Sequence, residues 1–140
     1  RPRSVAFSPD GSRAYVPSEN GATITVIDAR RLAPIRTIPL GEGVRPMGTV
    51  MSADGATLYV STGRSKMVMF LDPKVNEVLA AVEVGPRPWG IALSPDGRTI
   101  FTANGPSNDV SVIDVATRTV TKKIPVERGP WGVVVVERAR

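Results

Sequence analysis

The side chains best suited to bind a ligand are arginines and tryptophans in four related loops. The loops read RPR, VRPM, PRPW and RGPW, and they begin at residues 1, 44, 86 and 128. Arginine forms bidentate hydrogen bonds with carboxylates and phosphates, and tryptophan offers a flat apolar face. These loops predict a site for an anionic or aromatic ligand, made of Arg3, Arg45, Arg87, Trp89, Arg128 and Trp131, with Arg1 beside them.

The same residues also have a structural interpretation. Proline and glycine shape the loops, Trp89 and Trp131 recur one repeat apart, and Met47 at the same position is also a packing residue. In this interpretation the indoles pack against the next unit and the arginines are solvated. The arginines are the stronger argument for a ligand, because like charges repel each other unless an anion lies between them.

The composition excludes several kinds of catalytic site. The 140 residues include no His and no Cys. This chain alone therefore cannot form a Ser-His-Asp triad, a His-ligated zinc or haem, a disulfide or a thiolate nucleophile. Asp10, Asp54 and Asp96 lie in turns and lack the alternating acids of a calcium loop. We therefore expect no catalytic residue, no metal and no cofactor in this chain.

Three sequence markers show that the chain is built from repeats. Asp-Gly pairs begin at residues 10, 54 and 96, and the acids that end VID, FLD and VID fall at residues 28, 72 and 114, so both markers step by 44 and 42. Prolines 2, 46, 88 and 130 keep the same register. A period in the low forties with several short apolar runs is typical of β-propeller blades, which bury their faces by stacking on one another. The predicted units are 1–44, 45–86 and 87–128, followed by a closing strand within 129–140.

The pattern of apolar residues and turns in each unit predicts four antiparallel strands. In the third unit the first strand is Gly90–Ser94, whose small residues suit the innermost position, and SPDG then turns the chain into TIFTA. The third strand ends in an Asp whose carboxylate can accept hydrogen bonds from backbone amides of the next turn. The fourth strand must lie at an edge, because Pro39 and Pro125 cannot donate to a ladder. The fold class is all-β, with about three four-stranded blades plus one extra strand at Trp131–Val136.

The loops fall into two groups. The arginine and tryptophan loops precede the innermost strands, so they should gather at one mouth of a central channel. We expect the turns between the second and third strands, SENGAT, TGRSKM and NGPSND, at the opposite mouth, where they could carry partner specificity.

The segments AYVPSENGATITVIDARRLAPIRTIPLG and IFTANGPSNDVSVIDVATRTVTKKIPV, each preceded by an Arg-Pro pair and SPDG, resemble the YVTN-type β-propeller repeat. This resemblance implies a seven-bladed, WD-repeat-like propeller of bacterial or archaeal type, exported to the periplasm or cell surface. Since the chain has no His, neither a haem ligand nor the histidine of propeller lactonases can be assigned to it. Seven such blades need roughly 300 residues. We therefore expect the chain to be the C-terminal part of a larger propeller, completed by missing sequence or by a second chain.

Three functions follow from these observations. The first is a non-catalytic scaffold that binds a protein or an anionic ligand at the channel mouth, outside the bacterial cytoplasm. The second is part of a propeller enzyme, either a lactonase-like hydrolase or a subunit of a periplasmic oxidoreductase, with its catalytic groups on absent blades. The third is binding of single-stranded nucleic acid through arginine and tryptophan. The net charge of +5 suits any anionic partner. No membrane span is predicted, because no apolar run reaches roughly 18 to 20 residues.

Overall fold

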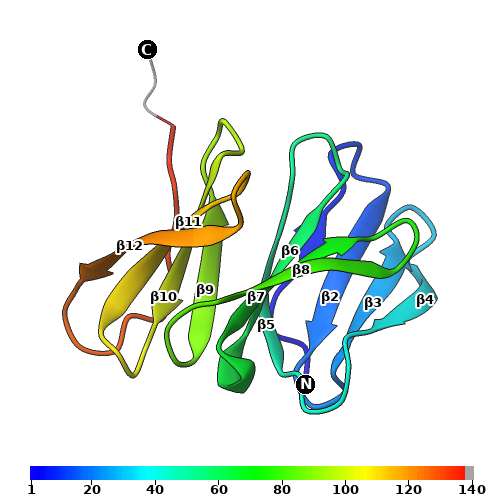
Figure 1. Ribbon diagram of the computed structural model, residues 1–140. Coiled ribbons are helices and arrows are strands. Elements are labelled where there is room, and N and C mark those ends of the chain that lie inside the picture. Colours follow the sequence, from blue (N-terminus) through cyan, green and yellow to red (C-terminus); the bar gives the residue numbers. More distant parts are fainter. Residues whose placement is uncertain (138–140) are drawn as a thin grey trace.

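The computed structural model describes residues 1–137 and forms three four-stranded antiparallel sheets, one per repeat (Figure 1). We call them blades 1, 2 and 3. Blade 1 holds β1 (Ala6–Phe7), β2 (Arg13–Ser18), β3 (Thr23–Asp28) and β4 (Ala33–Pro39). Blade 2 holds β5 (Pro46–Met51), β6 (Leu58–Thr62), β7 (Met67–Asp72) and β8 (Glu77–Glu83), with a short 3-10 helix η1 (Gly63–Ser65). Blade 3 holds β9 (Pro88–Leu93), β10 (Thr99–Asn104), β11 (Asp109–Asp114) and β12 (Thr119–Pro125). The all-β class and the four-stranded blades are confirmed.

The blades stack through their apolar faces, with the first strands closest together. β5 contacts both β1 and β9, so the first strands of successive blades are neighbours. Two apolar clusters fill the spaces between blades. The first joins Tyr15, Ile24 and Val26 to Leu58, Val60 and Leu71, and the second joins Tyr59, Val68 and Phe70 to Ile100 and Ile113. Burial of each aliphatic side chain contributes about 1.5–3 kcal/mol, so this stacking supplies much of the stability.

The prolines and turns behave as the repeat predicts. β4 and β12 are edge strands, and Pro39 and Pro125 lie at their ends. In the turn between the first and second strands, Gly11, Gly55 and Gly97 have φ angles of 67°, 70° and 71°, the left-handed conformation that glycine adopts without strain. At the end of β3, the Asp28 carboxylate accepts the backbone amides of Arg30 and Arg31 at 3.0 Å. The closing acids of the third strands are therefore part of the turns.

The extra strand predicted at Trp131–Val136 is not found. Residues 126–137 join no sheet in the described part of the chain. A strand needs a hydrogen-bonded neighbour. The first strand of each blade pairs with a second strand, whereas residues 126–137 have none beside them among the described residues. Residues 138–140 of the predicted closing strand lie outside the described residues, and the unit boundaries 1–44, 45–86 and 87–128 stay a prediction. None of the described helices is long and apolar enough to cross a membrane.

Candidate ligand-binding site at the channel mouth

The arginine and tryptophan loops lie at the same end of the blades as the turns between the second and third strands. Each first strand starts at the loops, and the second strand runs back antiparallel, so it ends where the first began. Contacts show this directly in blade 1, where Pro2 bridges to Ser18 and the Glu19 amide donates to the Arg1 carbonyl at 3.0 Å. The prediction that these turns lie at the opposite mouth is therefore wrong.

Glu19 is the residue of this site that sequence reasoning missed. Its Oε2 atom lies 2.7 Å from Arg3 Nε and 2.5 Å from Arg3 Nη2, and 3.6 Å from Arg1 Nη1. The Glu19 side chain is only 15% exposed. The chain therefore supplies one anion of its own to the arginines that the sequence gathers at this mouth.

A repeated pair of positions organises the mouth. Residues 3, 47 and 89 are equivalent in the three repeats, and so are residues 19, 63 and 105. A Cβ atom on Gly105 would lie 2.5 Å from Trp89 Cζ3, and one on Gly63 would lie 3.1 Å from Met47 Cγ. In blades 2 and 3 a large side chain thus rests on a glycine of its own blade. Blade 1 replaces this apolar contact with the ion pair of Arg3 and Glu19. The sequence could have indicated that Glu19 lies beside Arg3, because these two residues occupy the same pair of repeat positions as Met47 and Gly63.

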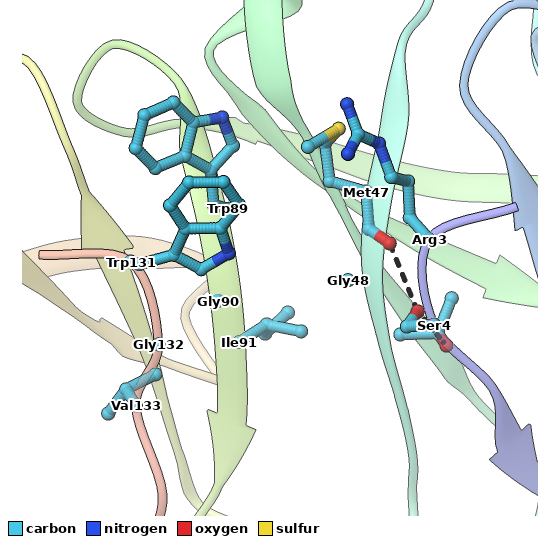
Figure 2. A pocket seen from close by; sticks show the side chains of 11 residues that line it. Arg3, Ser4, Met47, Gly48, Trp89, Gly90, Ile91, Trp131, Gly132 and Val133 are labelled. Carbon is cyan, nitrogen blue, oxygen red and sulfur yellow. Dashed lines mark hydrogen bonds between the residues drawn. The ribbon is translucent and has the colours of Figure 1, made fainter. Parts of the chain in front are cut away.

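The two tryptophans stack on each other (Figure 2). Their ring centroids are 4.8 Å apart and the planes are inclined by 33°. Trp89 is therefore covered by Gly105 on one side and by Trp131 on the other, while Trp131 is 66% exposed. This supports the packing interpretation for Trp89.

Two adjoining hollows open at the mouth. The inner one, of about 290 Å³, lies between the first strands, and Figure 2 shows Trp89 and Trp131 on one side of it with Met47 and Arg3 on the other. Its wall includes Ser4, whose hydroxyl donates to the Met47 carbonyl at 3.0 Å. The outer hollow, of about 190 Å³, is lined by Arg1, Arg3, Arg64 and Arg87, and by Glu19. Glu19 is the only acid among the described residues that line either hollow.

The structure brings together some of the predicted site residues and leaves others outside. Arg3, Trp89 and Trp131 line both hollows, and Arg87 lines the outer one. Arg64, which the sequence did not indicate, joins them. Arg45 and Arg128 line neither hollow. Arg45 instead donates to the Asn20 side chain at 3.3 Å, and Arg128 is exposed.

The backbone of Arg87 adopts a conformation that a glycine adopts at the equivalent position of the next repeat. Arg87 has a φ angle of 50°, in the left-handed region that residues other than glycine seldom occupy. The equivalent residue of the next repeat is Gly129, which has a φ angle of 66°. Blade 3 thus holds an arginine at a position where the conformation favours glycine, and that arginine lines the outer hollow.

Comparison with known proteins agrees with this architecture. A family described as Lactonase, 7-bladed beta-propeller matches residues 1–130. No curated protein matches the chain. Among solved structures, hydrazine synthase of Kuenenia stuttgartiensis is 29% identical with a TM-score of 0.86, covering 94% of this chain and 38% of that one. A protein from Lactobacillus plantarum is 18% identical with a TM-score of 0.81, covering 94% of this chain and 43% of that one. The chain thus spans less than half the length of these two proteins.

Proposed function

Because the chain belongs to the Lactonase family of seven-bladed β-propellers, we propose that it is a YVTN-type part of such a propeller whose channel mouth binds a small anionic ligand. The observation that carries this proposal is the outer hollow, where four arginines face one glutamate. Arg3 and Arg1 form salt bridges with Glu19. In the described part of the chain, Arg64 and Arg87 form no salt bridge, which leaves two guanidinium groups for a ligand. The repeat resemblance supports a location in the bacterial periplasm or outside the cell.

Arg87→Gly is a direct test of the mouth. Glycine suits the left-handed backbone at this position, as Gly129 does in the next repeat, so the fold should not suffer. The chain has two tryptophans, both at this mouth, so intrinsic tryptophan fluorescence reports ligand binding there. We expect titration with citrate or inorganic phosphate to change this fluorescence, and Arg87→Gly to weaken the affinity about tenfold, because a charge-assisted hydrogen bond is lost.

The matched control is Arg45→Gly. Arg45 precedes the equivalent proline in the second repeat but lines neither hollow. Its replacement removes the same charge and should leave the affinity within about twofold of the original, because the Arg45 side chain donates to Asn20 and does not line the hollow. An equal loss in both variants would contradict a defined site at the mouth.

A second candidate function is hydrolysis of a lactone, which the family match favours. Glu19 would be the group to activate water or hold a proton, because it is the carboxylate that lines the outer hollow beside Arg3. A panel of lactones tests this candidate, with Glu19→Gln expected to lower the rate by about 100-fold or more and exposed Glu42→Gln expected to leave it unchanged. Lactones that open no faster with the protein than without it would reject this candidate. Binding of single-stranded nucleic acid has weaker support, because both faces of Trp89 are covered.

A further inference from the structure

A larger hollow, of about 490 Å³, lies between blades 1 and 2 at the end of the blades away from the mouth. It is lined by the turns between the first and second strands of both blades and by the turn after β7. Tyr15 and Val26 line it on the blade 1 side, together with Arg13 and Arg36, and Lys74 comes from blade 2. We call this hollow the interblade groove. We propose that the interblade groove is a second binding site, for a small molecule that carries a phosphate or carboxylate group.

The groove opens beside a small residue of blade 1. Val26 is equivalent to Phe70 in blade 2, and Tyr15 is equivalent to Tyr59. Phe70 packs edge-on against Tyr59, with ring centroids 5.0 Å apart and an interplanar angle of 89°. In blade 1 the smaller valine fills less of the space beside Tyr15, and the hollow opens there.

The cations of the groove are particular to this pair of blades. The repeat does not need them, since the equivalent residues one unit later are neutral and small. Arg13, Arg36 and Lys74 correspond to Thr57, Ala80 and Ala116. Between blades 2 and 3, Ala80 and the neighbouring Val115 instead pack against the apolar cluster. The three cations are therefore a local feature, and the stacking of blades does not account for them.

The acids in the groove are already engaged by their own turns. Asp10 accepts the Ser8 hydroxyl at 2.6 Å, and both its carboxylate oxygens contact the Ser12 hydroxyl. Asp54 accepts the Ser52 hydroxyl at 2.6 Å and the Ala56 amide at 2.9 Å. These bonds lower the pKa of both carboxyl groups. Since the third repeat has the same arrangement at Asp96, the acids belong to the turn. Among the described residues neither acid forms a salt bridge with a cation of the groove, although the charge of Lys74 also lowers the pKa of Asp54.

The cations keep donors free for an anion. Arg13 is linked to Asp28 at 3.4 Å, yet its side chain is 42% exposed. Arg36 donates through Nη2 to the Pro73 carbonyl, which fixes the guanidinium between the blades and leaves its other N–H groups. Lys74 makes no side-chain hydrogen bond to the described residues. Arg30 and Arg31 line an adjoining hollow that shares Arg13 and Asp10 with the groove and also includes Asp28.

These features indicate the chemistry of the ligand. A hollow of this size is in the usual range for small-molecule sites, roughly 300–1,000 Å³. Arginine and lysine suit phosphate and carboxylate oxygens. Burial raises the pKa of Tyr15, so its phenol stays protonated, and its ring can support an apolar part of the ligand.

The test uses pyrophosphate and citrate as separate probes, followed by backbone amide NMR of the full chain. We expect at least one probe to shift the amides of Gly55 and Lys74, and Lys74→Gln to weaken its binding about fivefold to tenfold, with Arg36→Gln as a second variant. A response to pyrophosphate alone identifies a phosphate ligand, and a response to citrate alone identifies a carboxylate ligand. If neither probe shifts these amides up to saturating concentration, the proposal is overturned.

Two controls separate the groove from general attraction and from the mouth. Lys122 is equivalent to Arg36 in blade 3 and lies on the exposed edge strand β12, so Lys122→Gln should leave binding unchanged. If Lys122→Gln weakened binding as much as Lys74→Gln does, the binding would be explained by general attraction to a basic chain, and the proposal would be overturned. Arg87→Gly should leave the groove amides responsive. The tryptophan signal at the mouth and the amide signal in the groove can therefore fail independently.

Discussion

Trp89 lies against Gly105 so closely that a Cβ atom on the glycine would be 2.5 Å from the indole Cζ3 atom. Gly105→Ala should push the ring away and destabilise the protein by about 1–3 kcal/mol, the usual cost of overpacking. Urea unfolding measures the loss, and a change in tryptophan emission reports the displaced ring. Gly21→Ala, in the corresponding turn of blade 1, is the control, because its nearest neighbour at 3.3 Å is the Thr23 hydroxyl of a side chain. Equal losses in both variants would contradict the Trp89 contact.

Gly48 permits the first strands of blades 2 and 3 to approach each other. A Cβ atom there would lie 2.8 Å from the Trp89 carbonyl oxygen, and a backbone atom cannot rotate aside as a side chain can. Gly48→Ala should therefore cost about 1–3 kcal/mol of stability. The equivalent residue in blade 1 is Ser4, whose hydroxyl contacts Met47 and Thr49. Ser4→Ala should cost only about 1 kcal/mol, the value of its hydrogen bonds. Chemical denaturation measures the stability loss of both variants. A larger loss in Ser4→Ala than in Gly48→Ala would show that the strands can move apart at Gly48.

Acid should destabilise the fold through the turn aspartates. The Ser8 hydroxyl, followed by donors from Ser12, holds the pKa of Asp10 well below its usual value of 3.8. A carboxyl whose pKa is lower in the folded state stabilises that state above its unfolded pKa, and this stabilisation is lost as the pH falls. The free energy of unfolding should therefore decline between about pH 5 and pH 2.

Ser8→Ala tests this contribution, although it also removes the acceptor of the Arg13 backbone amide at 2.9 Å. Loss of the strongest donor should raise the pKa of Asp10 toward its usual value, which carboxyl NMR measures, and should flatten the acid decline in stability. Ser65→Ala is the control, because the Ser65 hydroxyl donates to the Gly43 carbonyl at 3.4 Å and serves no carboxylate. An Asp10 titration that stays unchanged in Ser8→Ala would contradict this origin of the acid sensitivity.

Val26→Phe should close the interblade groove. Phenylalanine is the natural residue at the equivalent position 70, where it packs against Tyr59. We expect the variant to lose the amide response to pyrophosphate and citrate, and to lose no more than about 1–3 kcal/mol of stability, the usual cost of adding volume to a core. Thermal unfolding and the NMR titration measure these two effects. A stable variant that still binds either probe with its original affinity would place that binding outside the groove.

The sequence predicts the blades well because their markers are local. Each turn between the first and second strands has its own glycine in the left-handed conformation, and two of the three fourth strands carry a proline that only an edge tolerates. Gly97 and Pro125 can therefore be interpreted without knowledge of the rest of the chain. The extra strand at Trp131–Val136 fails for the opposite reason. A strand exists only with a partner, and the pattern of one segment cannot supply one.

The mouth is predicted only in part. Arg3, Arg87, Trp89 and Trp131 are brought together by their common place in the repeat, at or near the start of the predicted first strand. Glu19 was missed because SENGAT was interpreted as a turn at the other mouth, although antiparallel strands must return it to the same one. The groove depends on the size of Val26 relative to Phe70 across a blade interface, and such a difference in packing has no signature within a single repeat.

Arg87 and Gly129 both have a left-handed φ angle, and this makes the mouth adjustable by single substitutions. A designer can insert or delete a guanidinium at that position without rebuilding the loop, because the conformation is already present in a residue that lacks a side chain. The preference of the mouth for one charge over another can then be changed in one blade at a time, while the strands of the blades stay unchanged.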